Sequence, residues 1–278
     1  MPNNKLSGSR ILVVGGTSGI GFAIAQLALE SNANVIIASS STSKIQAAIK
    51  RLQESCPDST ASIAGHPVAL GDETAEENII KLFEYATSPS LFPPSGQEGD
   101  SNTEGKDRIL LDHIAFTAGN IPNLHPPTSP SINKAYINSI GDVRVIGAAL
   151  LAKHSQKYLR QSRSSSITLT SGANVDRPQK GWTFGAMMSG ATEGMARGLA
   201  VDLAPVRVNV VSPGAVDTEI FDRFGDKREE FMKKFGEQTL TGSVGKPMDI
   251  AEAYVYAMRD WNLAGEKIGS NGGRLLHT

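Results

Sequence analysis

The sequence predicts an α/β protein with a single doubly wound parallel sheet and helices on both faces. Two observations predict this fold. Short apolar runs alternate with longer amphipathic segments along the chain, and a glycine-rich turn joins the first run to the first amphipathic segment. Strand–helix repeats of this kind build parallel sheets through right-handed crossovers. The chain has 278 residues, 40% of them hydrophobic, enough for a buried core. We therefore expect one domain over residues 1–278.

Strands are predicted where the short runs are β-branched or apolar, and helices where the segments between them are amphipathic. The first three strand–helix units are Ile11–Val14 with Ile20–Glu30, Val35–Ala38 with Ser43–Glu54, and Ser62–Leu70 with Ala75–Ala86. The next three are Ile109–Phe116 with Ser131–Leu159, Ser166–Thr170 with Trp182–Leu203, and Val206–Val210 with Pro247–Met258. A seventh short strand is predicted at Lys267–Ser270.

One segment interrupts the alternation. Thr87–Asp107 is rich in serine, proline, glycine and acidic residues and has little apolar surface to bury. Such a composition does not sustain a packed structure. We expect residues 87–107 to form a flexible surface insertion; the alternative is a functional lid.

The overall composition excludes several classes of protein. The net charge is −1, so no basic field favours nucleic acid or an anionic membrane. The single cysteine, Cys56, excludes an intramolecular disulfide framework and a cysteine-rich metal site. No segment reaches the roughly 20 apolar residues that a membrane span needs, and the N-terminus lacks an apolar signal region. We expect a cytoplasmic protein that binds a small-molecule substrate and no metal.

The glycine-rich turn VGGTSGIG, residues 14–21, follows the first strand and opens the first helix. Gly15 permits the tight turn, Gly19 lets the main chain approach a pyrophosphate, and Gly21 lets helix and strand pack closely. A helix N-terminus also attracts phosphate. An ordinary strand–helix turn is the alternative. The predicted dinucleotide contacts in this turn are Gly15, Thr17, Ser18, Gly19, Ile20 and Gly21.

These residues also resemble the nucleotide loop of the short-chain dehydrogenase/reductase superfamily. Four more segments match that family's pattern in the right order. They are Thr117–Gly119 (its Asn-Asn-Ala-Gly segment), TLTSG from Thr168 (its catalytic-serine segment), RVNVVSPGAVDT over Arg207–Thr218 (its Pro-Gly loop), and SVGKPMDIA from Ser243 with Gly272 and Gly273 (its C-terminal stretch). The resemblance implies a Rossmann-like sheet, a dinucleotide-dependent oxidoreductase, and a homodimer or homotetramer paired through the helices predicted at Ser131–Leu159 and Trp182–Leu203. It adds the cofactor contacts Leu70, Thr117, Ala118, Gly119, Pro213, Gly214, Val216 and Thr218.

The residues after the second predicted strand indicate which dinucleotide binds. A carboxylate there would bond the ribose 2′-hydroxyl of NAD and repel a 2′-phosphate. This chain has ASSSTSK, residues 38–44, with no acid, several hydroxyls and one ammonium. Those groups suit a phosphate, so NADP(H) is the predicted cofactor; the alternative is a solvated serine-rich turn. The predicted contacts are Ser39, Ser40, Ser41 and Lys44.

The resemblance also locates the catalytic positions. The family uses a serine, a tyrosine, a lysine four residues after the tyrosine, and an asparagine, because the alkoxide formed from a carbonyl must be protonated or stabilised. By spacing, these positions hold Ser171, Phe184, Met188 and Arg144 in this chain. No Tyr-x-x-x-Lys sequence occurs anywhere in it.

The three substituted positions have different expected roles. Phe184 keeps an aromatic ring without a hydroxyl, so we expect substrate packing or plain core packing there. Met188 is expected to be apolar filler without a catalytic role. Arg144 is always charged and presents several donors. It is expected to anchor the substrate or stabilise charge; the alternative is an ion pair with Asp142 or Asp176.

Three functions fit this pattern. The first is hydride transfer to an acceptor that needs little proton donation, such as an iminium or an activated double bond. The second is a non-redox isomerisation or cyclisation, and the third is NADP(H) binding without catalysis. One group of the family that resembles this chain in carrying arginine at the asparagine position is the reductase/Diels–Alderases of fungal indole-alkaloid pathways, which reduce an iminium. The first function, in secondary metabolism, is therefore the one expected. That group's second functional residue, an aspartate, is matched here by Gln179, with Asp176 three residues away.

Overall fold

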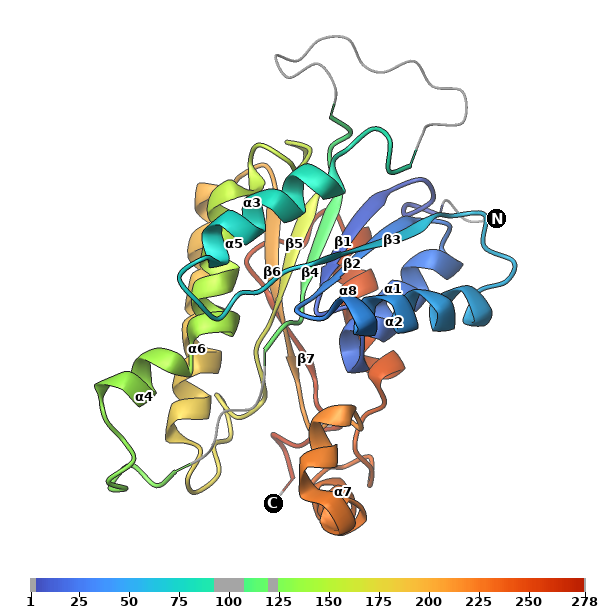
Figure 1. The fold of residues 1–278 in the computed structure, drawn as a ribbon. Coiled ribbons are helices and arrows are strands. Elements are labelled where there is room, and N and C mark those ends of the chain that lie inside the picture. Colours follow the sequence, from blue (N-terminus) through green and yellow to red (C-terminus); the bar gives the residue numbers. More distant parts are fainter. Residues whose placement is uncertain (1–3, 93–107, 120–124, 278) are drawn as a thin grey trace.

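The computed structural model describes residues 4–92, 108–119 and 125–277. Seven parallel strands form one sheet in the order β3-β2-β1-β4-β5-β6-β7 (Figure 1). The strands are β1 (Arg10–Val14), β2 (Asn34–Ser39), β3 (Ile63–Pro67), β4 (His113–Phe116), β5 (Ser166–Thr170), β6 (Arg207–Pro213) and β7 (Lys267–Ser270). The chain builds outward from β1 in one direction and then reverses to β4 on its other side. The loops at the carboxyl ends of β1 and β4 therefore diverge and leave a crevice between them.

Helices cover both faces of the sheet (Figure 1). One face is packed by α1 (Gly19–Glu30), α2 (Thr42–Ser55) and α8 (Pro247–Arg259), the other by α3 (Ala75–Ala86), α5 (Ala148–Ser155) and α6 (Thr183–Asp202). The strands are apolar on both sides because both faces are buried: Val13 belongs to the core with Ile24 and Tyr254, and Ile114 to the core with Phe83. The predicted doubly wound arrangement is confirmed.

Two predicted strands extend beyond the structured ladder. The run Ser62–Leu70 forms a strand only over Ile63–Pro67, where it pairs with β2. After Pro67 the chain makes one more bond, from Val68 N–H to the carbonyl of Ser39 at 2.8 Å, and leaves the sheet. The run Ile109–Phe116 is a strand only from His113, because its earlier residues make a single bridge, Leu111 with Leu159.

The helix predicted at Ser131–Leu159 is wrong as a continuous element. The structure has α4 (Lys134–Ser139), a π-helical turn η1 (Asp142–Gly147) and then α5. In η1 the N–H of Ile146 donates to the carbonyl of Gly141 at 3.0 Å, five residues earlier. This wider turn carries Arg144 in its middle, and π-turns of this kind often occur at functional sites.

Two elements after β6 are not among the predicted ones: the 3-10 segment η2 (Glu219–Lys227) and helix α7 (Arg228–Gly236). They form a lobe that stands away from the sheet, near the C-terminus (Figure 1). Aromatic contacts hold the lobe together; Phe224 stacks on Phe231 with ring centroids 4.2 Å apart, and Phe221 meets Phe235 edge to face.

The predicted insertion 87–107 lies mostly outside the described residues, which end at 92 and resume at 108. Its first part is not loose. Thr87 is fully buried and Phe92 is 7% exposed, and the Arg10 guanidinium donates to the carbonyls of Ser88 and Phe92. The prediction of a flexible insertion is therefore wrong for residues 87–92 and stays a prediction for residues 93–107.

His113 on β4 makes the stability of the fold dependent on pH. Burial lowers the pKa of His113 from 6.5 to about 4; Asp112 opposes this shift and Arg207 adds to it. The folded protein therefore binds fewer protons than the unfolded chain between these values, and stability falls as pH falls through that window. We predict a loss from this group of about 2 kcal/mol between about pH 7.5 and about pH 5.

Replacing His113 with Asn, which can still bond Ser166, should remove this contribution. Urea unfolding of both proteins at the two pH values measures it. Equal losses of unfolding free energy in wild type and variant would show that His113 is not the group responsible.

Candidate active site

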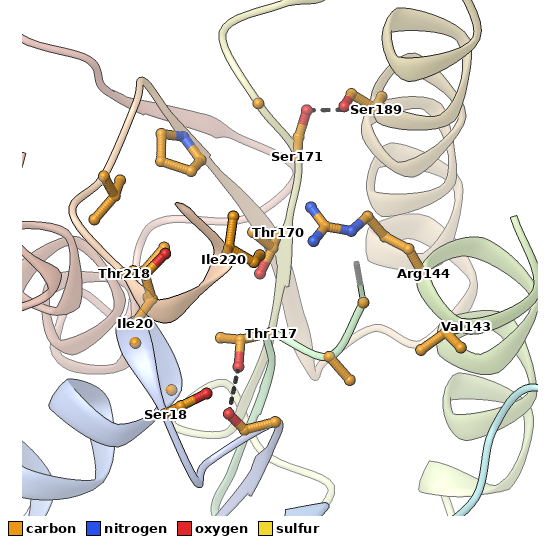
Figure 2. Close-up of a pocket in the computed structure, with 18 of the residues that line it drawn as sticks. Ser18, Ile20, Thr117, Val143, Arg144, Thr170, Ser171, Ser189, Thr218 and Ile220 are labelled. Carbon is orange, nitrogen blue, oxygen red and sulfur yellow. Dashed lines mark hydrogen bonds between the residues drawn. The ribbon is translucent and has the colours of Figure 1, made fainter. Parts of the chain in front are cut away.

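A cavity of about 550 Å³ opens at the carboxyl ends of the central strands, where the sheet order reverses (Figure 2). Its size is that of a typical small-molecule site. It is lined by residues from the loops that follow each of the strands β1 to β6, and by residues from η1, α6 and η2. Loops far apart in the sequence thus meet around one space.

The glycine turn forms a cradle that only glycine can build. A Cβ on Gly21 would lie 2.1 Å from the carbonyl oxygen of Gly15, so any side chain would push α1 away from β1. Gly15 itself has φ of 92°, a conformation that favours glycine. A Cβ on Gly19 would lie 2.9 Å from Thr218 Cγ2. The N-terminus of α1 is thereby held open to the cavity, which is the geometry that phosphate groups require.

Thr117 fastens the cradle to the next strand. Its hydroxyl lies 3.1 Å from the carbonyl of Val14 and 3.4 Å from that of Gly15, and it donates to either (Figure 2). The N–H of Thr117 also donates to the Val14 carbonyl at 2.8 Å. The turn after β1 and the end of β4 therefore form one rigid wall of the cavity.

The serines after β2 have two different roles. Ser39, Ser40 and Lys44 line the cavity, and the Thr17 hydroxyl donates to Ser39 Oγ at 3.3 Å. Ser41 is not among the described residues that line it. Ser41 is instead the N-cap of α2, and its side chain accepts from the N–H of Lys44 at 3.3 Å. Ser41 therefore has a structural role as a cap, and its contact with the cofactor stays a prediction.

Arg144 reaches from η1 into the cavity beside Thr170 (Figure 2). Its side chain passes over Gly119, where a Cβ would lie 2.8 Å from Arg144 Nε. That Nε is buried and has no hydrogen-bond partner in the described part of the chain. Burial lowers the pKa of Arg144, and the hydroxyl of Tyr254 opposes this only in part.

The alternative of an ion pair for Arg144 is not realised among the described residues. Asp176 pairs with Lys267, at 2.6 Å, and Asp142 makes no ion pair with the guanidinium. A desolvated guanidinium without an acid partner is costly unless a ligand completes its contacts. Arg144 is thus available to a bound molecule.

Ser171 also lines the cavity, at the end of β5, but its hydroxyl is turned toward α6. Ser171 Oγ lies 2.7 Å from Oε1 of Glu193 and 3.3 Å from the carbonyl of Ser189 (Figure 2 shows the second contact). Glu193 is only 5% exposed and contacts Lys267 Nζ at 3.2 Å through its other oxygen. The sequence reasoning missed Glu193. The available signal was an acid within the otherwise small and apolar helix GAMMSGATEGMA.

Of the two positions assigned on α6, only one lies at the cavity. Met188 lines it, whereas Phe184 is not among the described lining residues. The Phe184 ring packs edge to face on Tyr136 of α4, with centroids 5.6 Å apart. Gly185 and Ser189 are the other two α6 residues at the cavity. The packing contact expected as one alternative for Phe184 is thus present, and a contact of Phe184 with a substrate stays a prediction.

The remaining wall carries Gln179, which the sequence matched to the aspartate of the reductase/Diels–Alderases, and residues from outside the predicted cofactor and catalytic positions. Arg177 donates to the main-chain carbonyls of Arg274 and His277, and so holds the C-terminal segment over the cavity. Gln179 and Arg274 both donate to the Gln238 side chain. The lining residues of this wall are Asn174, Arg177, Gln179, Trp182, Glu219, Ile220, Phe221, Phe235, Thr239 and Arg274.

The cavity brings together all the other predicted site residues. They are Gly15, Thr17, Ser18, Gly19, Ile20, Gly21, Leu70, Thr117, Ala118, Gly119, Pro213, Gly214, Val216 and Thr218, in addition to those discussed above. No group of three or more His, Cys, Asp or Glu that could hold a metal occurs within the described ranges. None of the helices described is long and apolar enough to cross a membrane.

Comparison with known proteins identifies the family. A family model for SDR-like Rossmann domains matches residues 2–277. The short-chain dehydrogenase/reductase ucsE of Acremonium sp. is 39% identical over 276 residues, which cover 98% of this chain and 97% of the relative. The short-chain dehydrogenase/reductase malC of Malbranchea aurantiaca is 37% identical over 274 residues, covering 98% and 96%. The chain therefore belongs to the short-chain dehydrogenase/reductase family.

Solved structures agree with this family and with the predicted fold. The structure of the MalC reductase/Diels-Alderase from Malbranchea aurantiaca matches with a TM-score of 0.85 and 36% identity, covering 98% of both chains. A small-chain dehydrogenase solved in complex with NADPH matches with a TM-score of 0.71 and 25% identity, covering 97% of this chain and all of the other. The predicted family resemblance, including the likeness to reductase/Diels–Alderases, is confirmed.

The predicted preference for NADPH is testable at the end of β2. Replacing Ser39 with Asp places a carboxylate where the 2′-phosphate is expected, and charge repulsion should raise KM for NADPH roughly tenfold or more while NADH is favoured. Steady-state kinetics with both cofactors, or their dissociation constants by calorimetry, measure the change. Ser43→Asp is the matched control, because Ser43 is exposed and lies outside the cavity lining. An unchanged NADPH-to-NADH ratio in Ser39→Asp would exclude this location for the phosphate.

Proposed function

We propose that this protein is an NADP(H)-dependent reductase of secondary metabolism whose acceptor needs little proton donation, an iminium or an activated double bond. One observation carries the proposal. The described residues that line the cavity include no tyrosine, histidine or cysteine, and the α6 residues there are Gly185, Met188 and Ser189. The cofactor cradle is complete, and the titratable residues in the described lining are Lys44, at the expected place of the 2′-phosphate, Glu219 on η2 and three arginines, none of them on α6 where the family has its tyrosine and lysine.

The cradle fits the cofactor on structural grounds. The glycine turn leaves room for phosphate where a Cβ would collide, and Ser39, Ser40 and Lys44 stand at the expected place of the 2′-phosphate. The loop of Pro213, Gly214, Val216 and Thr218 closes the opposite end. When bound, NADPH supplies a hydride to the acceptor. An iminium carbon that accepts it becomes a neutral amine, so no alkoxide needs to be protonated.

Arg144 has the role of an anchor in this proposal. Its Nε is buried and unpartnered, and its guanidinium points into the cavity (Figure 2). Its donors match a carbonyl or other oxygen acceptor on the substrate. Held by that contact, the substrate is oriented against the wall formed by Gly119 and Thr170, and the desolvated charge of Arg144 is compensated only when a substrate is present.

A second candidate is a non-redox cyclisation in the same cavity. It is supported by the likeness, at 36% identity, to a structure named as a reductase/Diels-Alderase. For that reaction the cavity would act by shape and by the Arg144 contact. A purely binding function has weaker support, because Arg144 and the polar wall of Gln179 and Arg274 extend the cavity beyond what a dinucleotide cradle alone requires.

The proposed function is tested by following NADPH consumption with a preformed cyclic iminium and with simple ketones of the same ring size. We predict turnover of the iminium and none of the ketones. Turnover without net NADPH oxidation would favour cyclisation, and cofactor binding with no turnover of any acceptor would favour a binding protein. Ketone reduction at a comparable rate would contradict the proposal.

Replacing Arg144 with Ala separates anchoring from structure. Loss of a charged hydrogen bond to the substrate should lower kcat/KM roughly 10- to 100-fold, with NADPH affinity nearly unchanged. Because Arg144 has no acid partner in the described structure, the melting temperature should stay the same or rise. Arg197→Ala, at an exposed site on α6, is the matched control. Unchanged kinetics with a lower melting temperature would assign Arg144 a structural role instead.

A further inference from the structure

The Ser171 hydroxyl is the starting point. It has one hydrogen to donate, and it has two neighbours: Oε1 of Glu193 at 2.7 Å and the carbonyl oxygen of Ser189 at 3.3 Å. A carbonyl oxygen can only accept, and so can an ionised carboxylate. Whichever neighbour receives it, the hydrogen points toward α6 and away from the cavity.

Glu193 is also bonded on its far side. Its second oxygen lies 3.2 Å from Lys267 Nζ, and the same ammonium contacts Asp176 at 2.6 Å nearer the surface. Desolvation lowers the pKa of Lys267, but its bonds to Asp176 and Glu193 outweigh this and raise that pKa overall. Because an ammonium only donates, this contact uses Oε2 of Glu193 as an acceptor and leaves Oε1 to face Ser171.

This arrangement makes Ser171 a hydrogen-bond acceptor toward the cavity, where a serine could otherwise act as a donor. A donating serine would stabilise a carbonyl oxygen as negative charge develops on it. With its hydrogen directed at an acceptor on α6, Ser171 offers the cavity only oxygen lone pairs. Arg144, on the neighbouring wall, offers only donors. Ser171 therefore faces the cavity as a hydrogen-bond acceptor and Arg144 as a donor (Figure 2).

We propose that Glu193 is a positioning residue that fixes Ser171 as a hydrogen-bond acceptor, and that Ser171 thereby recognises a nitrogen that carries hydrogen, as in a protonated imine. The inference rests on the proposed function and narrows it. Among the acceptors that need little proton donation, it selects the protonated imine over the activated double bond, because a C=C group has no hydrogen to donate to Ser171. Arg144 then contacts a carbonyl or similar oxygen elsewhere on the same substrate.

Replacing Glu193 with Gln tests this by reversing the hydrogen bond. The Lys267 ammonium cannot accept, so the amide oxygen of the new side chain should face Lys267 and its NH₂ group should face Ser171. Ser171 then accepts from the amide, and its own hydrogen can be donated to a carbonyl oxygen in the cavity, in competition only with the more distant Ser189 carbonyl at 3.3 Å. In the variant, Ser171 should donate to the cavity instead of accepting from it, and the shape of the site should stay the same.

The readout is ligand binding, measured by calorimetry in the presence of NADP⁺ with two probes of similar shape: dihydroisoquinoline in its protonated form, and tetralone. We predict that the wild type binds the protonated imine more tightly. In Glu193→Gln its affinity should fall roughly tenfold or more, while tetralone binds more tightly than before. In a Ser171→Ala background the Glu193 substitution should have no further effect, because Glu193 acts through Ser171.

Asp176→Asn is the matched control. It removes the same charge from Lys267 but does not touch Ser171, so it should leave the ranking of the two probes unchanged. Equal ranking in wild type and Glu193→Gln, or an effect that persists in Ser171→Ala, would overturn the inference. Neutron diffraction from the wild-type protein gives an independent answer: a Ser171 hydrogen directed at Glu193 or Ser189 supports it, and one directed into the cavity overturns it.

The two proposals can fail separately. Selective imine binding that reverses in Glu193→Gln, with no NADPH consumption, would support the role of Ser171 and contradict the reductase. Imine reduction that is insensitive to Glu193 would support the reductase and contradict the role of Ser171.

Discussion

The close approach of α1 to β1 is the constraint on which the rest of the site depends. Because a Cβ on Gly21 would lie 2.1 Å from the carbonyl of Gly15, the helix can start directly behind the strand only with glycine there. That start directs the free N–H groups of the first turn into the crevice between the loops of β1 and β4. Thr117 then ties the turn to β4, and Thr218 lies against Gly19, so three separate strands are held around one cradle. The positions of Arg144 and Ser171 follow, since η1 and β5 pack against this wall.

Within that frame the cavity has an unusual electrostatic character. It keeps the groups that bind a dinucleotide, yet the described lining has no tyrosine, histidine or cysteine to deliver a proton. Its charged groups at the substrate end are Arg144, Arg177, Arg274 and Glu219, and the buried Nε of Arg144 has no hydrogen-bond partner among the described residues. Behind Ser171, a buried carboxylate and an ammonium fix the direction of one hydroxyl. Such preorganised polarity is suited to orienting a substrate that already carries the charge needed for reaction, rather than to creating that charge by proton transfer.

Local patterns in the sequence predicted most of the fold, because alternating buried strands and amphipathic helices leave a clear periodic signal. Ala75–Ala86 and Lys267–Ser270 have the predicted bounds.

The failures of the sequence-based prediction have physical causes. The apolar residues of 131–159 continue in helical spacing through a π-turn, so the bond from Ile146 N–H to the carbonyl of Gly141 leaves no signal in the sequence. Phe184 had the expected spacing from Ser171, but its ring turns toward Tyr136, so the neighbouring Gly185 faces the cavity. The sequence could predict the glycine cradle and Arg144, since these lie next to recognisable strand ends. Glu193 left one signal, an acid among small and apolar residues, whereas Arg274 reaches the site only through tertiary packing.

In the proposed reaction the protein delivers no proton in the hydride-transfer step. The most direct test is a single-turnover measurement with a cyclic iminium, comparing deuterated with ordinary NADPH and heavy with ordinary water. For hydride transfer without proton delivery, we expect a primary isotope effect from the deuterated cofactor and a solvent isotope effect close to unity. A solvent isotope effect that appears together with the primary one would show that a proton moves in the same step. That result would contradict the proposal that the protein delivers no proton there.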